Sequence, residues 1–226
     1  MKKDNVLVIV LIIFLFLVGT LSIRKMSKNT TQKPINKTNI NYQQKEESMP
    51  ASLSANKKMN QPEIIIDQNK KYEATLHTSV GDITLSLNTK ETPVTANNFI
   101  YLAKNQFYDN TIFHRVIDGF MIQGGDPRGD GTGGPGYQFA DEDFSGEYKR
   151  GTIAMANSGP NTNGSQFFIM HQNYALQPNY VIFGQVISGL EVVDKIATAQ
   201  VTNSFGGELS KPVEPVTINS ITITEN

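Results

Sequence analysis

One cation lies among apolar residues in a segment that resembles a half-buried strand. Arg115 follows Phe113-His114 and precedes Val116-Ile117. An arginine stays charged at any physiological pH, and its planar guanidinium donates in a fixed direction to electron density that develops during a reaction. A site of this kind needs neither a nucleophile nor a proton transfer. The alternative is that Arg115 is a surface residue of a strand, or that it forms an ion pair with Asp118 or Asp126.

Other common chemistries find little support in the composition. The 226 residues include no cysteine, which excludes disulfides, thiolate zinc sites and cysteine nucleophiles. His77, His114 and His171 are too few and too scattered for usual metal-ligand spacings, and His114 is predicted to be structural. The glycine-rich stretch 124–136 lacks the Gly-Lys-Ser/Thr ending of a phosphate loop and the ligand spacing of a calcium loop. We therefore expect no metal and no cofactor.

Two longer segments carry a specific pattern. The first is Phe113-His114-Arg115-Val116-Ile117-Asp118-Gly119-Phe120-Met121-Ile122-Gln123-Gly124-Gly125-Asp126, and the second is Met155-Ala156-Asn157-Ser158-Gly159-Pro160-Asn161-Thr162-Asn163-Gly164-Ser165-Gln166-Phe167-Phe168-Ile169. Together they resemble, almost letter for letter, the two signature stretches of the cyclophilin-type peptidyl-prolyl cis/trans isomerases. The segment Val181–Val186 is similar to a third stretch of that family. The resemblance spans nearly all of Tyr72–Asn226, in the order and spacing of the family.

The chemistry implied by this resemblance suits Arg115. Rotation of an X-Pro bond crosses a barrier of about 18–20 kcal/mol and takes roughly 10–100 s unaided. Amide resonance is lost during rotation, so electron density returns to the proline nitrogen. A fixed cation near that nitrogen, in an apolar site, stabilises the twisted state. Within this motif we interpret Arg115 as the catalytic residue.

The resemblance also implies a binding site for a proline-containing polypeptide. Its apolar pocket would be formed by Phe120, Met121, Phe168 and Leu176, although ordinary core packing is the usual place for such residues. Gln123 and Gln166 are expected to hydrogen-bond Arg115 or the substrate backbone. Ala156 and Asn157 would offer main-chain groups to an extended peptide.

The chain departs from the family pattern at two positions of the binding site. Ala175 stands where many members have tryptophan, and Tyr180 where many have histidine. Loss of an indole removes contact area and an N–H donor, which predicts weak cyclosporin binding. Tyr180 can still pack and hydrogen-bond, so activity is expected to survive. The alternative function is a non-catalytic module that binds proline segments or acts as a chaperone.

Periodicity and turn residues predict the elements that would position this site. Strands are expected at Tyr72–His77, Ile83–Leu87, Thr111–Ile117, Phe120–Gln123, Thr152–Ala156, Gln166–Met170, Val181–Val186 and Val216–Thr224. Helices are expected from Pro93 to Lys104 and from Leu190 to Ala197. The apolar parity slips at Asn219-Ser220, which predicts a β-bulge. The fold class is mainly β: a closed eight-stranded antiparallel barrel capped by two helices.

The first 63 residues differ in composition from the rest. Val6–Val18 is thirteen apolar residues, and the uncharged run continues to Ile23. Residues 1–23 are predicted to be a transmembrane anchor, with a cleaved secretory signal as the alternative. Residues 24–63, rich in Asn, Gln, Lys, Ser and Thr, are predicted to be a disordered basic linker. The isomerase domain is expected at 64–226.

Charge separates the linker from the domain. Residues 72–226 carry eight basic and sixteen acidic residues, a net −8, whereas residues 24–71 carry a net +6. An acidic domain makes nucleic acid an unsuitable partner. The expected partners are proline-containing polypeptides and, through the anchor, a membrane. The chain is predicted to be monomeric and single-pass, with its domain outside the cytoplasm, or secreted if the segment is cleaved.

Overall fold

The structure, a computed structural model, describes residues 58–226. The predicted anchor, and the linker up to residue 57, lie outside the described residues, so both stay predictions. Within residues 58–226, no helix combines the length and the apolar character needed to cross a bilayer.

Strands dominate the described chain. They are β1 (Tyr72–Thr78), β2 (Gly81–Leu87), β3 (Thr111–Ile112), β4 (Arg115–Ile117), β5 (Met121–Gly124), β6 (Thr152–Met155), β7 (Phe167–Met170), β8 (Ile182–Ser188), β9 (Val201–Asn203), β10 (Leu209–Pro212) and β11 (Thr217–Glu225). The eight predicted strands therefore form close to their expected bounds. The hairpin β9–β10 was not predicted.

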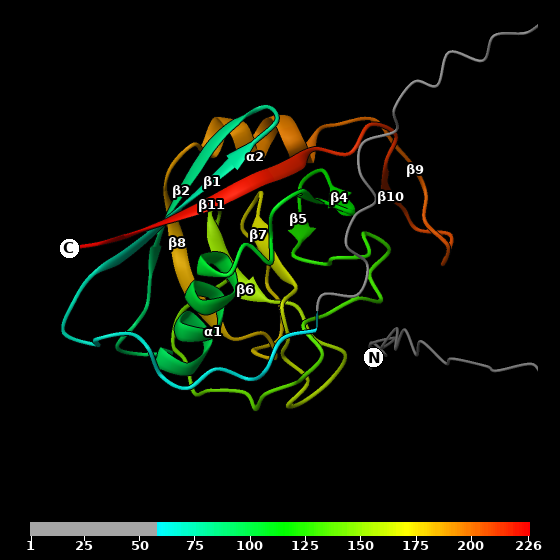
Figure 1. Ribbon diagram of the computed structural model, residues 1–226. Helices are drawn as coiled ribbons and strands as arrows, with labels where there is room; N and C mark the ends of the chain where they lie inside the picture. The colour runs from blue at the N-terminus through cyan, green and yellow to red at the C-terminus, as the bar shows by residue number, and fades with distance from the viewer. Residues whose placement is uncertain (1–57) are drawn as a thin grey trace, which may run out of the picture. The chain divides into compact units, whose positions relative to one another are not determined.

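Nine of these strands form one antiparallel sheet, in the order β3-β11-β1-β2-β8-β6-β7-β5-β4. The two end strands, β3 and β4, are separated in the chain by just Phe113 and His114. The stretch from Thr111 to Ile117 thus pairs with β11 through its first part and with β5 through its second. The sheet is accordingly strongly curled (Figure 1), but β3 and β4 do not pair with each other, so a curled half-barrel is shown and full closure of the expected barrel is not. The expected count of eight holds when β3 and β4 are taken as one interrupted strand, since Phe113 and His114 turn between two partners.

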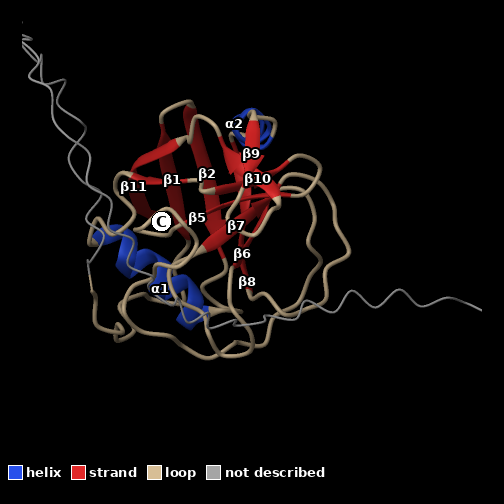
Figure 2. Ribbon diagram, turned by 90° about the vertical axis from the view of Figure 1, so that its right-hand side faces the viewer, coloured by secondary structure: helices blue, strands red, loops and turns tan. Residues whose placement is uncertain are grey.

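The two helices have the bounds that the sequence predicted. They are α1 (Pro93–Lys104) and α2 (Leu190–Ala197), and they lie near opposite ends of the curled sheet (Figure 2). Thr92 precedes α1, but its side chain does not cap the helix. Instead Glu142 accepts hydrogen bonds from the amides of Val94 (2.9 Å) and Thr95 (2.6 Å). This distant carboxylate occupies the favourable positive end of the helix dipole.

The sheet encloses the main apolar core. Its largest fully buried side chains include Phe99, Tyr108, Phe113, Phe167 and Phe183. The predicted bulge is confirmed, because the pairing of β1 with β11 shifts between His77–Ser220 and Thr78–Ile218. The shift lets both halves of the long strand β11 turn apolar side chains toward the core.

Contacts with the rest of the domain begin before residue 64, at Met59. The amide of Met59 donates to the carbonyl of Pro135 (2.7 Å), and the amide of Ile65 donates to Asn97 (2.7 Å). Ile66 is buried, whereas Ile64 is half exposed. Residues 58–63 were placed in the linker by the sequence, and the exact domain boundary stays a prediction.

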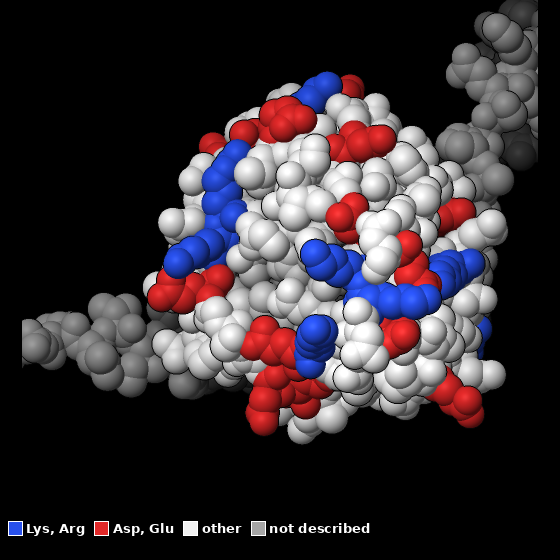
Figure 3. Space-filling view, turned by 90° about the vertical axis from the view of Figure 1, so that its left-hand side faces the viewer, with Lys and Arg blue, Asp and Glu red and all other residues white. Residues whose placement is uncertain are grey.

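Charges of both signs are interspersed on the face that Figure 3 shows. Acidic and basic side chains lie close together there, consistent with several ion pairs at the surface. Lys70 pairs with Glu225, and Lys149 pairs with Glu147.

Candidate active site

Arg115 begins β4 and lies directly opposite Gln123 of β5. Its side chain is about one third exposed, so the guanidinium is at the surface while its stem is covered. Nη1 lies 3.7 Å from the sulfur of Met121 and 3.4 Å from Oε1 of Gln123. The centre of the guanidinium is 6.0 Å from the ring centroid of Phe120. Three predicted site residues therefore surround this cation.

A second apolar cluster, separate from the main core, lies beside Arg115. We call it the pocket cluster. Its buried members are Met121, Tyr148, Ala154, Phe168, Met170 and Ile182, and the half-buried side chains that pack on it include Phe120, Ala156, Leu176 and Tyr180. All the predicted pocket residues thus meet in one place, drawn from β5, the turn before it, β7 and the loop before β8.

A chain of amide hydrogen bonds connects Arg115 to the glycine-rich loop. Gln123 donates through Nε2 to Oε1 of Gln166 (3.0 Å). Gln166 in turn donates to the carbonyls of Gly131 (3.0 Å) and Gly133 (2.9 Å). The predicted partner of Arg115 is therefore Gln123, whereas Gln166 holds the loop. Each amide uses both its donor and its acceptor side, which fixes its orientation.

Asp126 organises the loop itself. This fully buried carboxylate accepts the amides of Arg128 (2.8 Å), Asp130 (3.2 Å) and Gly131 (2.6 Å). At Gly133 a side chain would collide with Asp126, since an added Cβ would lie 1.9 Å from its Oδ1. Glycine at position 133 is thus required by the geometry of the loop.

Ala156 and Asn157 lie where two grooves adjoin. One groove, of about 870 Å³, is lined by Gln123, Gln166 and the glycine-rich loop, and the other, of about 750 Å³, by Tyr180; both are lined by Asn157. The amide of Ala156 already donates to the carbonyl of Gln166 (3.0 Å). The N–H of Ala156 therefore already has a partner within the domain.

Tyr180 packs edge to face on Phe168, with ring centroids 5.5 Å apart and planes at 86°. Its backbone is held by Tyr148, whose hydroxyl donates to the carbonyl of Tyr180 (2.9 Å) and accepts from its N–H (3.1 Å). Burial raises the pKa of the Tyr148 phenol, so this group stays protonated. Tyr148 was not predicted from the sequence.

Tyr174 was likewise missed. Its ring lies 4.7 Å from that of Phe120, tilted by 47°. Ala175, the adjacent residue, is exposed. Here an aromatic ring contacts the pocket although the family's tryptophan is absent. The sequence signal that could have indicated Tyr174 is its position directly before Ala175, where many members of the family have tryptophan.

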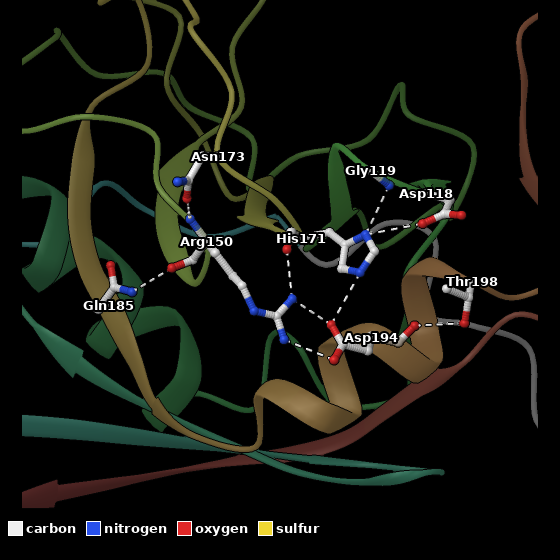
Figure 4. Close-up of polar contacts among 8 residues, drawn as sticks. All are labelled: Asp118, Gly119, Arg150, His171, Asn173, Gln185, Asp194 and Thr198. Carbon is white, nitrogen blue, oxygen red and sulfur yellow. Dashed lines mark hydrogen bonds and ion pairs between the residues drawn. The ribbon is translucent and has the colours of Figure 1, made fainter.

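A polar cluster supports the turn that precedes β5 (Figure 4). The amide of Gly119 donates to Nδ1 of His171 (3.0 Å), so the imidazole proton is on Nε2, 3.2 Å from Asp194 of α2. Arg150 binds Asp194 through two hydrogen bonds (2.6 and 2.9 Å) and the carbonyl of His171 (2.7 Å). The hydrogen bonds from Arg150 lower the pKa of the Asp194 carboxyl group. This cluster joins α2 to the turn that carries Phe120.

His114, the neighbour of Arg115, fits a structural role. Desolvation by burial lowers the pKa of its imidazole, outweighing the attraction of Asp126. A neutral ring beside Arg115 adds no second charge to the site.

The strongest partner of Arg115 comes from a distant part of the chain. Glu208, 93 residues later, accepts hydrogen bonds from Nε (2.6 Å) and Nη2 (2.7 Å). The sequence alternatives, Asp118 and Asp126, lie beside His171 and within the glycine-rich loop instead. Glu208 ends the turn of the hairpin β9–β10, and the only sequence signal was Gly206-Gly207 between short strand-like runs.

Comparison with known proteins identifies the family. Residues 74–223 match the family model described as cyclophilin type peptidyl-prolyl cis-trans isomerase/CLD. The match covers more than half of the chain, and it includes the curled sheet, both helices, Arg115 and the pocket cluster. The chain belongs to the cyclophilin-type peptidyl-prolyl cis-trans isomerase family and is an enzyme of that class.

Individual relatives agree. A peptidyl-prolyl cis-trans isomerase of Arabidopsis thaliana is 48% identical over 161 residues, covering 67% of this chain and 96% of the relative. A probable peptidyl-prolyl cis-trans isomerase A of Mycobacterium leprae is 47% identical over 172 residues, covering 67% of this chain and 91% of the relative. The crystal structure of a cyclophilin from Cryptosporidium parvum superposes with a TM-score of 0.64 at 38% identity, over 69% of this chain and 99% of that one.

Proposed function

We propose that Arg115 catalyses X-Pro rotation in polypeptides whose proline ring enters the pocket cluster. Met121, Phe168 and Leu176 would bind the ring by apolar contact. The guanidinium would face the imide nitrogen and stabilise the electron pair that localises there as resonance is lost. No covalent bond forms or breaks, and no proton is transferred.

The observation that carries this proposal is the approach of Nη1 of Arg115 to Met121 and Gln123 at the edge of a buried apolar cluster. A cation beside an apolar surface acts through a lower effective dielectric than one in open water. Its charge is therefore felt more strongly by a ring seated on that surface.

An extended peptide would leave the pocket along Ala156 and Asn157. The half-buried side chain of Gln123 and the carbonyl of Ala156 would hold its backbone, much as a strand is added to a sheet. Support comes from a relative: the Cryptosporidium parvum cyclophilin, 38% identical, was also crystallised in the presence of the dipeptide Ala-Pro.

The test is isomerisation of an X-Pro peptide by the full chain and its Arg115→Ala variant. We expect kcat/KM to fall about 100-fold, which corresponds to roughly 2.7 kcal/mol of lost transition-state stabilisation. Lys104→Ala, which removes a cation at the end of α1, is the control and should retain wild-type turnover. Equal turnover by wild type and Arg115→Ala would contradict the role of Arg115.

A binding module is the competing function for the same groove. It would bind the peptide with little turnover before and after the substitution. Measuring peptide affinity beside the rate separates the two, because Arg115→Ala in an enzyme lowers the rate far more than the affinity.

We further propose that residues 1–23 hold this enzyme at a membrane, with the domain outside the cytoplasm, where it would act on exported chains. The support is the uncharged run from Val6 to Ile23 and the basic residues that follow it. Carbonate extraction should leave the full chain with the membranes, and removal of residues 1–23 should release it.

Orientation has its own experiment. Protease added to intact cells should digest the domain without lysis. Digestion that requires lysis would contradict the external placement, and a shortened mature chain in the medium would favour a cleaved signal.

A further inference from the structure

Glu208 makes the strongest contact that the guanidinium of Arg115 has within residues 58–226. Two charge-assisted hydrogen bonds, at 2.6 and 2.7 Å, join its carboxylate to Nε and Nη2. Parallel bonds of this kind fix the plane of an arginine as well as its position. The hydrogen bonds from Arg115 lower the pKa of the Glu208 carboxyl group, so the carboxylate is charged at neutral pH.

The other contacts of Arg115 are weaker. Nη1 is 3.4 Å from Oε1 of Gln123, near the outer limit of a hydrogen bond, and 3.7 Å from the sulfur of Met121, a poor acceptor. The side chain is one third exposed and has four rotatable bonds, so these contacts alone would leave it several orientations. Orientation therefore depends on the carboxylate.

Glu208 binds one edge of the Arg115 guanidinium and thereby determines which nitrogen faces the pocket cluster. Because Nε and Nη2 point toward the hairpin, Nη1 is the nitrogen directed toward Met121 and Gln123. Rotation about the terminal bonds would break both bonds to Glu208 together. The hairpin lies beside β4 (Figure 1), so Glu208 can hold Nε and Nη2 of Arg115 while Nη1 lies near Met121 of the pocket cluster.

We propose that Glu208 is a positioning residue of this isomerase, which holds the guanidinium of Arg115 so that Nη1 faces the proline pocket. The inference rests on the catalytic role proposed for Arg115. It assigns a function to the hairpin β9–β10, which contributes no residue to the pocket cluster.

The opposite effect, a carboxylate that competes with substrate for the cation, is disfavoured by the geometry. A competitor would occupy the nitrogen that faces the pocket, whereas Glu208 binds the far edge. Both side chains are also partly exposed, which screens the carboxylate's charge. Fixed orientation is then the larger effect on the reaction.

The experiment uses the full chain with Glu208→Gln, which keeps the shape but removes the charge. We expect kcat for an X-Pro peptide to fall roughly tenfold, with KM changed less than about twofold, because misorientation of a catalytic group affects the transition state most. The matched control is Glu214→Gln, the same charge change at an exposed residue beyond β10, which should leave both constants unchanged.

A double-mutant cycle tests whether Glu208 acts through Arg115. In an Arg115→Lys background, the ammonium has no fork to orient, so Glu208→Gln should change kcat less than about twofold. The Nε–H resonance of Arg115 in nuclear magnetic resonance spectra should move in Glu208→Gln and stay in Glu214→Gln. A variant that merely destabilises the fold would not shift the Arg115 Nε–H resonance alone.

The outcomes are distinct. Unchanged or increased kcat in Glu208→Gln, or an equal drop in the wild-type and Arg115→Lys backgrounds, would overturn the positioning role. Failure of Arg115→Ala to lower the rate would instead overturn the proposed catalytic role of Arg115, whatever Glu208 does.

Discussion

At the residue scale, the hydroxyl of Tyr148 replaces a backbone partner for Tyr180. It bonds both the carbonyl and the N–H of that residue, at 2.9 and 3.1 Å. Tyr148→Phe would leave both groups unpaired in a half-buried site, at a cost of about 1–3 kcal/mol. Urea unfolding should reveal this loss of stability. KM for an X-Pro peptide should rise because the backbone of Tyr180 is no longer held in place.

Tyr174→Phe supplies the comparison for that substitution. Its side chain is half exposed, so loss of the hydroxyl should change the free energy of unfolding by less than about 0.5 kcal/mol. Equal stabilities of the two variants would show that the Tyr148 hydroxyl is not needed.

Ala175 permits a gain-of-contact prediction. Ala175→Trp would add an indole with its N–H donor at the exposed rim next to Leu176. We expect cyclosporin to bind the variant about tenfold more tightly than wild type, measured by titration calorimetry. Ala175→Leu adds apolar area without a donor and should gain less. Equal, weak binding by all three chains would mean that another residue limits the affinity.

Most of the site residues were assigned through the resemblance of two uninterrupted segments to the family, whereas Leu176 and Tyr180 lie outside both segments. The resemblance implied Phe120, Met121, Gln123 and Phe168, and the structure places Phe120 just before β5 and pairs Gln123 of β5 with Phe168 of β7. Glu208 could not be found this way. It contacts Arg115 across 93 residues, and two other acids are far nearer in the chain. Which acid pairs with a cation depends on strand pairing, which spacing alone does not determine.

At the element scale, α2 supports the active-site turn through Asp194. Asp194→Asn would weaken the bonds to Arg150 and remove the charged acceptor of His171 (Figure 4). We expect a lower Tm than wild type at pH 7 and a lower kcat, since the turn bearing Phe120 loses its support. Asp143→Asn, at an exposed loop position, is the control for loss of one charge.

The pH dependence of this effect has a defined sign. Arg150 depresses the pKa of Asp194 below its ordinary value of 3.8 in the folded state. A group of this kind stabilises the fold above its unfolded pKa, and that contribution is lost as the pH falls through the folded pKa. The difference in Tm between wild type and Asp194→Asn should therefore shrink below about pH 4. A constant difference from pH 7 to pH 2 would argue against an ionic role.

The elements themselves were predictable where apolar alternation is long. Strands β1 and β2 follow it closely, β11 follows it on either side of its bulge, and both helices follow the spacing of three and four residues instead. The hairpin β9–β10 was missed because Val201–Asn203 is three residues long and Pro212 ends the second strand. The break between β3 and β4 was also missed, since Phe113 continues the apolar character of Ile112 and gives no sign that the strand changes partner there.

At the scale of the whole molecule, acidic and basic parts of the chain are segregated. Residues 72–226 carry a net negative charge, whereas residues 24–71 carry a net positive charge. The composition of the N-terminal segments is read directly from the sequence, and the start of the domain at residue 64 stays a prediction. That boundary depends on contacts with residues far along the chain, such as Pro135.

Those contacts lead to a prediction about the start of the domain. Met59 packs against the main core and donates its amide to Pro135, and the carbonyl of Glu63 accepts from Asn97. A chain begun at residue 64 loses these contacts, whereas one begun at residue 58 keeps them. We expect the shorter chain to be less stable by about 1–2 kcal/mol in urea unfolding, from lost apolar burial and hydrogen bonding.

Lys58→Ala in the longer chain keeps the backbone contacts and should match its parent in stability. A drop in stability confined to the shorter chain would assign residues 59–63 to the folded domain. Equal stability of the two chains would instead make the segment before Ile64 a dispensable part of the linker.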